Sequence, residues 1–161
     1  MPNSDGELRN KAIQLWEAGQ TLEAGRLICE NLSPEARVEW AANILRLVVE
    51  RAGIECPSID HVLSIAKHPP ERKTAHDANS VARNQASELC EIRVRSAEQN
   101  LLLSSLTLAF LVARVIYNAT DPPDPFDEDN GWSIASSLKK IVEMLGDDEF
   151  SQSSLSALCG T

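Results

Sequence analysis

Apolar side chains recur at three- and four-residue spacing along most of the chain, which is the pattern of helices that bury one face. Glycine and proline divide this pattern into segments, because both residues mark helix ends. The segments predicted as helices are 7–18, 22–31, 34–52, 57–68, 72–94, 97–118, 132–145 and 149–158. Nothing in the pattern predicts a sheet, so the sequence predicts an all-α, compact, single-domain bundle of seven or eight helices.

Several helix starts carry a capping signal. Asp5 and Thr21 are predicted to cap the first two helices, and Asn130 the seventh. Ser33 followed by Pro34 is typical of a helix start, because proline has no N–H to lose at the first helical position. We therefore expect these residues to fix the helix boundaries.

The stretch between residues 71 and 121 contains neither glycine nor proline. A single helix of that length would span roughly 75 Å, which is too long for a compact domain of this size. Ser96 and Gln99 match a capping box, so we expect a break there. Residues 90–95 alternate with period two and are also compatible with a short strand, although a lone strand has nothing to pair with.

The segment 97–118 is apolar nearly all round, which indicates a helix buried on most sides. Ser104, Ser105, Thr107 and Arg114 interrupt it, whereas a membrane span needs about 20 mostly apolar residues. We therefore expect a central core helix around which the other helices pack, and no membrane partner.

Composition agrees with one folded domain, since 43% of the residues are hydrophobic and 24% are charged. We expect a flexible N-terminus at 1–6 and a single helical domain at 7–161. The N-terminal residues show no apolar leader, which favours a cytoplasmic location. The four cysteines are widely spread and lie beside apolar patterns, which indicates buried free thiols: Cys29, Cys56, Cys90 and Cys159.

An acidic, proline-rich loop is predicted at 120–131. The chain carries a net charge of −9, and residues 119–161 account for −7 of it, with nine acidic residues against two lysines. Such a surface repels phosphate backbones, so it disfavours nucleic acid and favours a basic protein partner. The candidate interaction residues in this loop are Asp124, Phe126, Asp127, Glu128 and Asp129.

Two further expectations concern this loop. Phe126 and Trp132 are its apolar residues, and they either anchor it onto the helix at 97–118 or contact a partner. The cations between residues 67 and 95 are expected, in part, to face the acidic C-terminal region within the fold: Lys67, Arg72, Lys73, Arg83, Arg93 and Arg95.

No motif predicts a cofactor, a metal or a catalytic centre. Aligning Gly131 with the glycine of a calcium-binding EF-hand loop puts Phe126 and Ser137 where carboxylates are needed. The histidines His61, His68 and His76 contain no pair four residues apart, so solvent-facing histidines are the expected arrangement.

The segment 15–36 resembles the central part of a tetratricopeptide repeat. Leu15, the turn glycine Gly19, Glu23-Ala24 and Pro34 carry the resemblance, which covers about one hairpin. The proline falls two residues early and no second copy follows at the period of that family. The resemblance implies a helical hairpin at this place.

These features favour an acidic protein–protein interaction module of the adaptor or inhibitor kind. A small immunity-type or antitoxin-type protein that neutralises a basic partner is one concrete version. An enzyme or small-ligand-binding domain with a pocket between helices is the alternative. A self-associating structural subunit is a third reading, and the sequence leaves the oligomeric state open.

Overall fold

The computed structural model describes residues 4–68, 70–120 and 132–159 of the chain. This part of the chain contains eight helices and no strand, which confirms the all-α bundle. The helices are α1 (Ser4–Glu17), α2 (Thr21–Glu30), α3 (Pro34–Ala52), α4 (Pro57–Lys67), α5 (Arg72–Cys90), α6 (Ala97–Asn118), α7 (Ser133–Leu145) and α8 (Asp148–Leu158).

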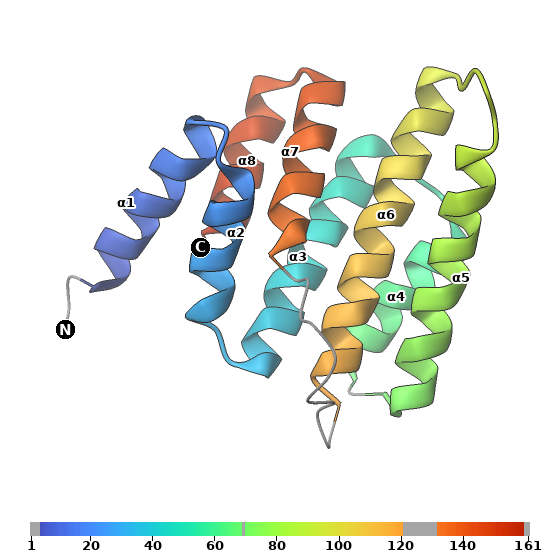
Figure 1. Ribbon diagram of the computed structural model, residues 1–161, viewed down its shortest axis with the longest axis horizontal. Coiled ribbons are helices and arrows are strands. Elements are labelled where there is room, and N and C mark those ends of the chain that lie inside the picture. Colours follow the sequence, from blue (N-terminus) through green and yellow to red (C-terminus); the bar gives the residue numbers. More distant parts are fainter. Residues whose placement is uncertain (1–3, 69, 121–131, 160–161) are drawn as a thin grey trace.

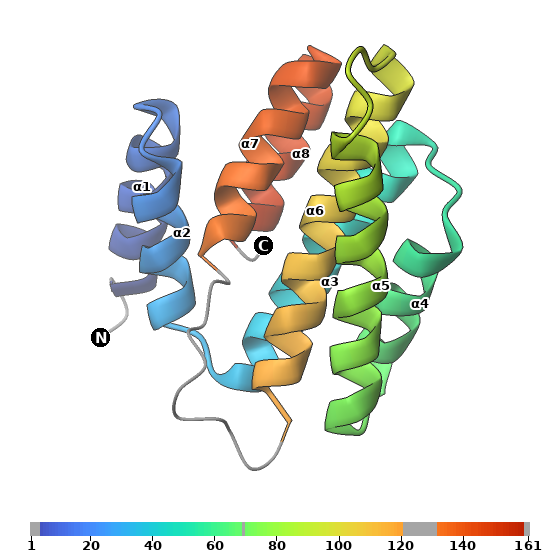
Figure 2. The same ribbon diagram turned by 45° about the vertical axis from the view of Figure 1, so that its right-hand side comes forward.

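Successive helices run up and down, so alternate turns lie at the same end of the bundle (Figures 1 and 2). The α1–α2, α5–α6 and α7–α8 turns lie at one end, and the α2–α3 and α4–α5 turns lie at the other. Helices α1 and α2 pack against each other around Gly19, whose φ of 82° favours glycine. The helical hairpin predicted at this place is therefore confirmed.

Helix α6 is the central helix, as predicted, and it packs against α3, α4, α5 and α7. Its serine and threonine hydroxyls have partners: Ser105 and Thr107 donate at 2.8 Å to carbonyls one turn earlier, and Ser104 donates to the sulfur of Met144 at 3.5 Å. By length and composition alone α6 would pass as a membrane span, a test that the core helix of a soluble protein also passes.

A stripe of small side chains brings α5 against α6. The stripe follows helical spacing and is buried: Ala75, Ala78, Ala82 and Ala86. Ala109 and Ala113 of α6 are fully buried as well. Because alanine places only a methyl group between two helices, the two backbones approach closely, and large side chains have no room there.

The C-terminal helix is tied to α3 through a tryptophan. The Nε1 atom of Trp40 donates a hydrogen bond of 2.9 Å to the carbonyl oxygen of Leu158. Both residues are buried, and Phe150 of α8 is only 1% exposed. A buried indole needs a partner for its N–H, so this bond fixes the position of α8 on the bundle.

The predicted helix boundaries hold in the middle of the chain and shift elsewhere. Ser33 caps α3, and Ser96 and Gln99 form the predicted capping box of α6. Helix α1 begins three residues earlier than expected, with Asp5 inside it. Helix α5 ends at Cys90 instead of residue 94, and residues 91–95 form the turn that follows.

Two predicted caps change. Thr21 is the first residue of α2, and its hydroxyl lies 2.8 Å from that of Ser136 on α7, so it joins two helices instead of capping one. Helix α7 begins only at Ser133, so its N-cap is Trp132. Trp132 makes no side-chain cap bond, because an indole has a donor but no acceptor. Asn130, the predicted cap, lies outside the described residues.

Trp132 does anchor the start of α7, although against α2 instead of α6. The guanidinium carbon of Arg26 lies 5.2 Å from the centre of the Trp132 ring. The backbone of Trp132 closely approaches Gly25, where a Cβ atom would also come within 2.9 Å of the Cβ of Ala135. Glycine is therefore required at position 25 for this contact.

Replacing the alanine at the centre of the α5 stripe tests the packing against α6. We predict that Ala82→Leu lowers the free energy of unfolding by about 1 to 3 kcal/mol, because the larger side chain overpacks a filled contact. Urea denaturation followed by circular dichroism measures this change. Val81→Leu is the matched control, since Val81 is 48% exposed and should tolerate the change. Equal stability of the two variants would contradict the described packing.

Candidate functional site

The interaction residues predicted from the sequence lie outside the described part of the chain. Asp124, Phe126, Asp127, Glu128 and Asp129 all belong to 121–131. Helix α6 ends before this range at the end of the bundle opposite the α5–α6 turn, and α7 begins after it about half-way along the bundle (Figures 1 and 2). The acidic residues of the C-terminal region that follow residue 131 are described, and they define a different surface.

That surface, called here the acidic end, comprises the last turn of α3 at 50–51, the α5–α6 turn at 88–98 and the α7–α8 turn at 143–149. Up-and-down topology brings the two turns to the same end of the bundle (Figures 1 and 2). The segments hold eight carboxylates and three guanidinium groups, a balance of −5. The carboxylates are Glu50, Glu88, Glu91, Glu98, Glu143, Asp147, Asp148 and Glu149.

Two of the three guanidinium groups have contacts within the fold. Arg95 donates to the carbonyls of Leu89 and Ile92 at 3.3 and 3.2 Å and to Oδ1 of Asn100 at 2.8 Å. Arg51 pairs with acidic side chains of the α7–α8 turn. The negative charge of the acidic end is therefore only partly balanced.

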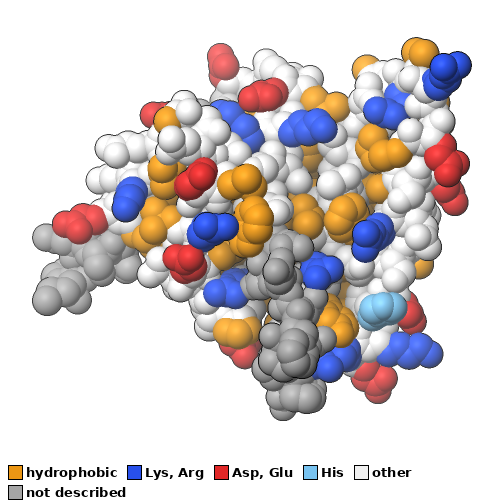
Figure 3. Space-filling view, in the orientation of Figure 1, with side chains coloured by type: hydrophobic (Ala, Val, Ile, Leu, Met, Phe, Trp, Pro, Cys, Tyr) orange, Lys and Arg blue, Asp and Glu red, His pale blue; other side chains and the backbone are white. Residues whose placement is uncertain are grey.

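Large apolar side chains are exposed among these charges. Val94 is 88% exposed at the α5–α6 turn, Ile92 is 36% exposed beside it, and Met144 of α7 is 41% exposed. Figure 3 shows hydrophobic side chains at the upper right tip, where this turn lies, with Lys and Arg beside them, and Asp and Glu further along the upper margin and lower on the right side. An exposed apolar group with a charged surround is typical of a protein-binding surface.

The α5–α6 turn is held in a defined shape. Oγ of Ser96 accepts from the Gln99 amide at 3.1 Å, and the Gln99 side chain accepts from the Ser96 amide at 2.9 Å. The Arg95 guanidinium holds the other side of the turn. These contacts present Val94 to solvent at little cost in conformational entropy on binding.

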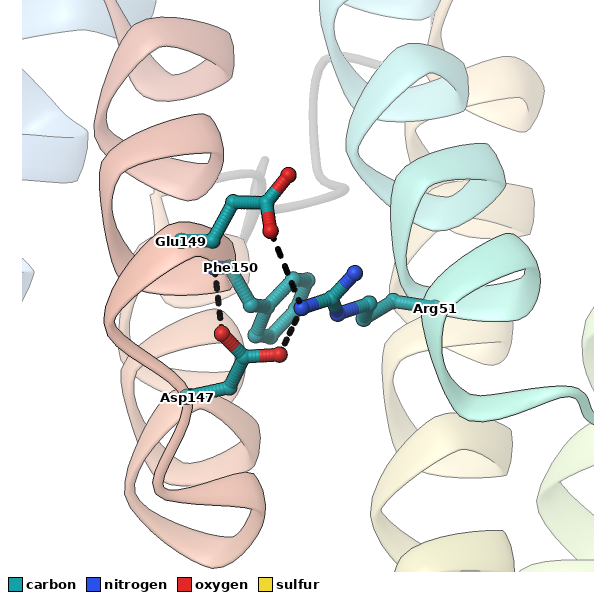
Figure 4. A network of polar contacts seen from close by, with 4 residues as sticks. All are labelled: Arg51, Asp147, Glu149 and Phe150. Carbon is teal, nitrogen blue, oxygen red and sulfur yellow. Dashed lines mark hydrogen bonds and ion pairs between the residues drawn. The ribbon is translucent and has the colours of Figure 1, made fainter.

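The α7–α8 turn is organised around Asp147 (Figure 4). One carboxylate oxygen of Asp147 accepts from the Phe150 amide at 3.2 Å and so caps α8, and the other oxygen pairs with Arg51 of α3. Glu149 lies 3.7 Å from the same guanidinium. Gly146, with φ of 59°, ends α7 in the left-handed conformation. The turn is thus joined to α3 by side chains as well as by packing.

Two hollows open on the sides of the bundle. The first, of about 460 Å³, lies between α5 and α6, and the second, of about 380 Å³, lies between α3 and α4. The first is lined by His76, Asn79, Ser80, Arg83, Asn84, Arg114 and Tyr117. Its lining is polar and carries positive charge, in contrast to the acidic end.

Histidines and cysteines assemble no metal site among the described residues. All three histidines are exposed, as predicted. All four cysteines are free. The expectation that they are buried holds for Cys29, whereas Cys56 and Cys159 are partly buried, and it is wrong for Cys90, which ends α5 beside the turn and is exposed. Burial raises the pKa of the Cys159 thiol above its ordinary value, against the opposing effect of Arg9, so this thiol is less readily ionised.

Two of the six cations named as candidates to face the acidic C-terminal region have other contacts in the described structure. Arg72 donates to Oγ1 of Thr120 at 3.2 Å and lies over the Tyr117 ring, and Arg95 holds the α5–α6 turn. The ion pairs of Asp147 and Glu149 are made by Arg51, which the sequence did not single out. The expectation for 121–131 itself lies outside the described residues.

Comparison with known proteins adds no family or fold neighbour. No protein-family model matches the chain, and no curated protein or solved structure matches it either. The candidate site therefore rests on the geometry and the charges of this chain alone.

Asp147 offers a test of the way in which the acidic end is held. We predict that Asp147→Ala lowers the free energy of unfolding by about 1 to 2 kcal/mol, because α8 loses its cap and α3 loses an ion pair. Asp147→Asn should retain the cap and most of the stability. Asp148→Ala is the matched control, because Asp148 is exposed. Chemical denaturation measures all three, and a loss no greater for Asp147→Ala than for Asp148→Ala would refute the role of Asp147.

Proposed function

We propose that this protein is an interaction module that binds a basic protein partner through the acidic end. The observation that carries the proposal is the placement of Val94, almost fully exposed, on a rigid turn at the end of the bundle where eight carboxylates outnumber three guanidinium groups. Val94 itself lies between Arg93 and Arg95 in the chain. An inhibitor or immunity-type protein that neutralises a basic partner is the concrete form that this chemistry favours.

The two kinds of side chain have different roles in binding. Unbalanced carboxylates attract a basic partner from a distance and increase the association rate, in a manner that salt weakens. Apolar side chains such as Val94 and Ile92 supply the area that is buried on contact, and they act mainly on dissociation. A partner that fits this surface carries lysine or arginine around an apolar patch.

The glutamates and aspartates of the acidic end are available for such contacts. All are exposed except Asp147, which is partly buried under its contact with Arg51. Substituting the exposed ones removes charge without removing a buried group, so the fold should survive. Binding and stability can therefore be tested separately.

The experiment compares proteins captured from an extract of the source organism by three baits. The first is the natural chain, the second carries Glu91→Gln, Glu98→Gln, Glu143→Gln and Asp148→Asn, and the third carries Glu7→Gln, Glu23→Gln, Glu35→Gln and Glu39→Gln as a charge-matched control. We expect the second bait to lose a basic partner that the natural and control baits retain. Quantitative mass spectrometry measures the captured amounts.

A fourth bait, Val94→Ser, separates the apolar contribution from the charge. It should lose the same partner while its melting temperature stays unchanged, because Val94 is 88% exposed. Capture by the natural chain should weaken as ionic strength rises above about 0.15 M. Equal capture of the same proteins by all four baits would refute the acidic end as the binding surface.

A further inference from the structure

The hollow between α5 and α6 combines residues from two antiparallel helices that lie side by side (Figures 1 and 2). On α5, His76, Ser80 and Asn84 follow each other at four-residue spacing, as do Asn79 and Arg83, so they share one side of the helix. Arg114 and Tyr117, three residues apart on α6, complete the lining. We propose that this hollow binds a small molecule through an oxyanion group, a phosphate or a carboxylate.

The charged side chains that line the hollow are all basic. The lining holds two guanidinium groups, Arg83 and Arg114, and no carboxylate. The lining therefore has a formal charge of +2 in a chain whose net charge is −9. Arg114 also has a partner within the protein, so Arg83 is the guanidinium group on which the proposal depends. Figure 3 shows a histidine on the surface formed by α5 and α6 with Lys and Arg side chains above and below it, and Asp or Glu side chains at its right and below. Guanidinium groups bind phosphate and carboxylate oxygens through paired N–H donors.

The second hollow shows that this charge pattern is not shared by every depression of the surface. Its lining includes Glu35 and Glu39 together with Arg46 and Lys67, so its charges cancel. Nη1 of Arg46 also donates to Oδ1 of Asn43 at 2.8 Å within that lining. The α3–α4 hollow therefore serves as an internal control for the α5–α6 hollow.

Uncharged polar side chains also line the α5–α6 hollow. Ser80 and Asn84 bring a hydroxyl and an amide to the lining, and both can donate to an oxyanion. Asn79 is already held, because its amide donates to the carbonyl of Phe110 at 2.7 Å. Asp77, which is not part of the lining, lies 3.6 Å from Nδ1 of His76 and is the acidic group nearest to this side chain in the described contacts.

Aromatic groups define one end of the hollow. The rings of His76 and Tyr117 lie with their centres 6.3 Å apart, and the guanidinium of Arg72 lies 5.4 Å from the centre of the Tyr117 ring. Arg72 is in turn held by Thr120. A volume of about 460 Å³ lies within the range of about 300 to 1,000 Å³ that is usual for small-molecule sites.

Isothermal titration calorimetry with pyrophosphate and, separately, with citrate tests the proposal and distinguishes the two oxyanion classes. The buffer should hold about 0.15 M salt, so that weak surface attraction is screened. We expect one of the two probes to bind the natural chain. Arg83→Gln and Asn84→Asp should each weaken that binding by about tenfold or more, by removing a cation or adding a carboxylate.

The matched controls are Arg46→Gln and Asn43→Asp in the α3–α4 hollow, which should leave the affinity within about twofold. Arg83 and Asn84 are exposed, so these variants should melt like the natural chain. Binding of pyrophosphate with this pattern assigns the site to phosphates, and binding of citrate assigns it to carboxylates. Absence of binding for both probes, or equal weakening by the control variants, would overturn the proposal.

Discussion

Burial of α6 is the constraint on which the rest of this structure depends. A helix with apolar side chains nearly all round must be covered on most sides, and α3, α4, α5 and α7 supply that cover. The alanine stripe of α5 allows that helix to approach α6 closely. The hydroxyls of Ser105 and Thr107 bond within the helix, so these two residues carry no unpaired hydroxyl into the core.

The same constraint creates both the acidic end and the α5–α6 hollow. Helices that run alternately up and down around α6 place alternate turns together, and this brings the acidic turns at 88–98 and 143–149 to one end. Contact between α5 and α6 along their length leaves the polar hollow on the outer side of that pair. A negative end and a positive side hollow can therefore coexist in one small domain, each suited to a ligand of the opposite charge.

The sequence predicted the architecture well because the signals that define it are local. Ser33 with Pro34 and the Ser96–Gln99 capping box act within four residues, and α6 is recognised from its own composition. Thr21 was misassigned because its partner, Ser136, is distant in sequence. The exposure of Cys90 was missed because α5 ends four residues earlier than its pattern suggested.

The candidate site depends on contacts between distant segments, which explains why the sequence indicated acidity without showing where it gathers. The charge excess of 119–161 was visible, but Glu50, Glu88, Glu91 and Glu98 join it only through topology. In an up-and-down bundle every second turn lies at the same end. This rule, applied to the predicted helices, would have indicated that these glutamates lie near the α7–α8 turn. Arg51 likewise becomes relevant only when α3 and the α7–α8 turn meet.

The most direct measurement of the central claim is mapping of amide chemical shifts on isotopically labelled protein during titration with an amphipathic peptide of lysine and leucine. If the acidic end is the binding surface, the largest shifts fall in 91–98 and 143–149 and diminish with salt. Shifts spread evenly over the surface, or concentrated on α1 and α2, would contradict the claim.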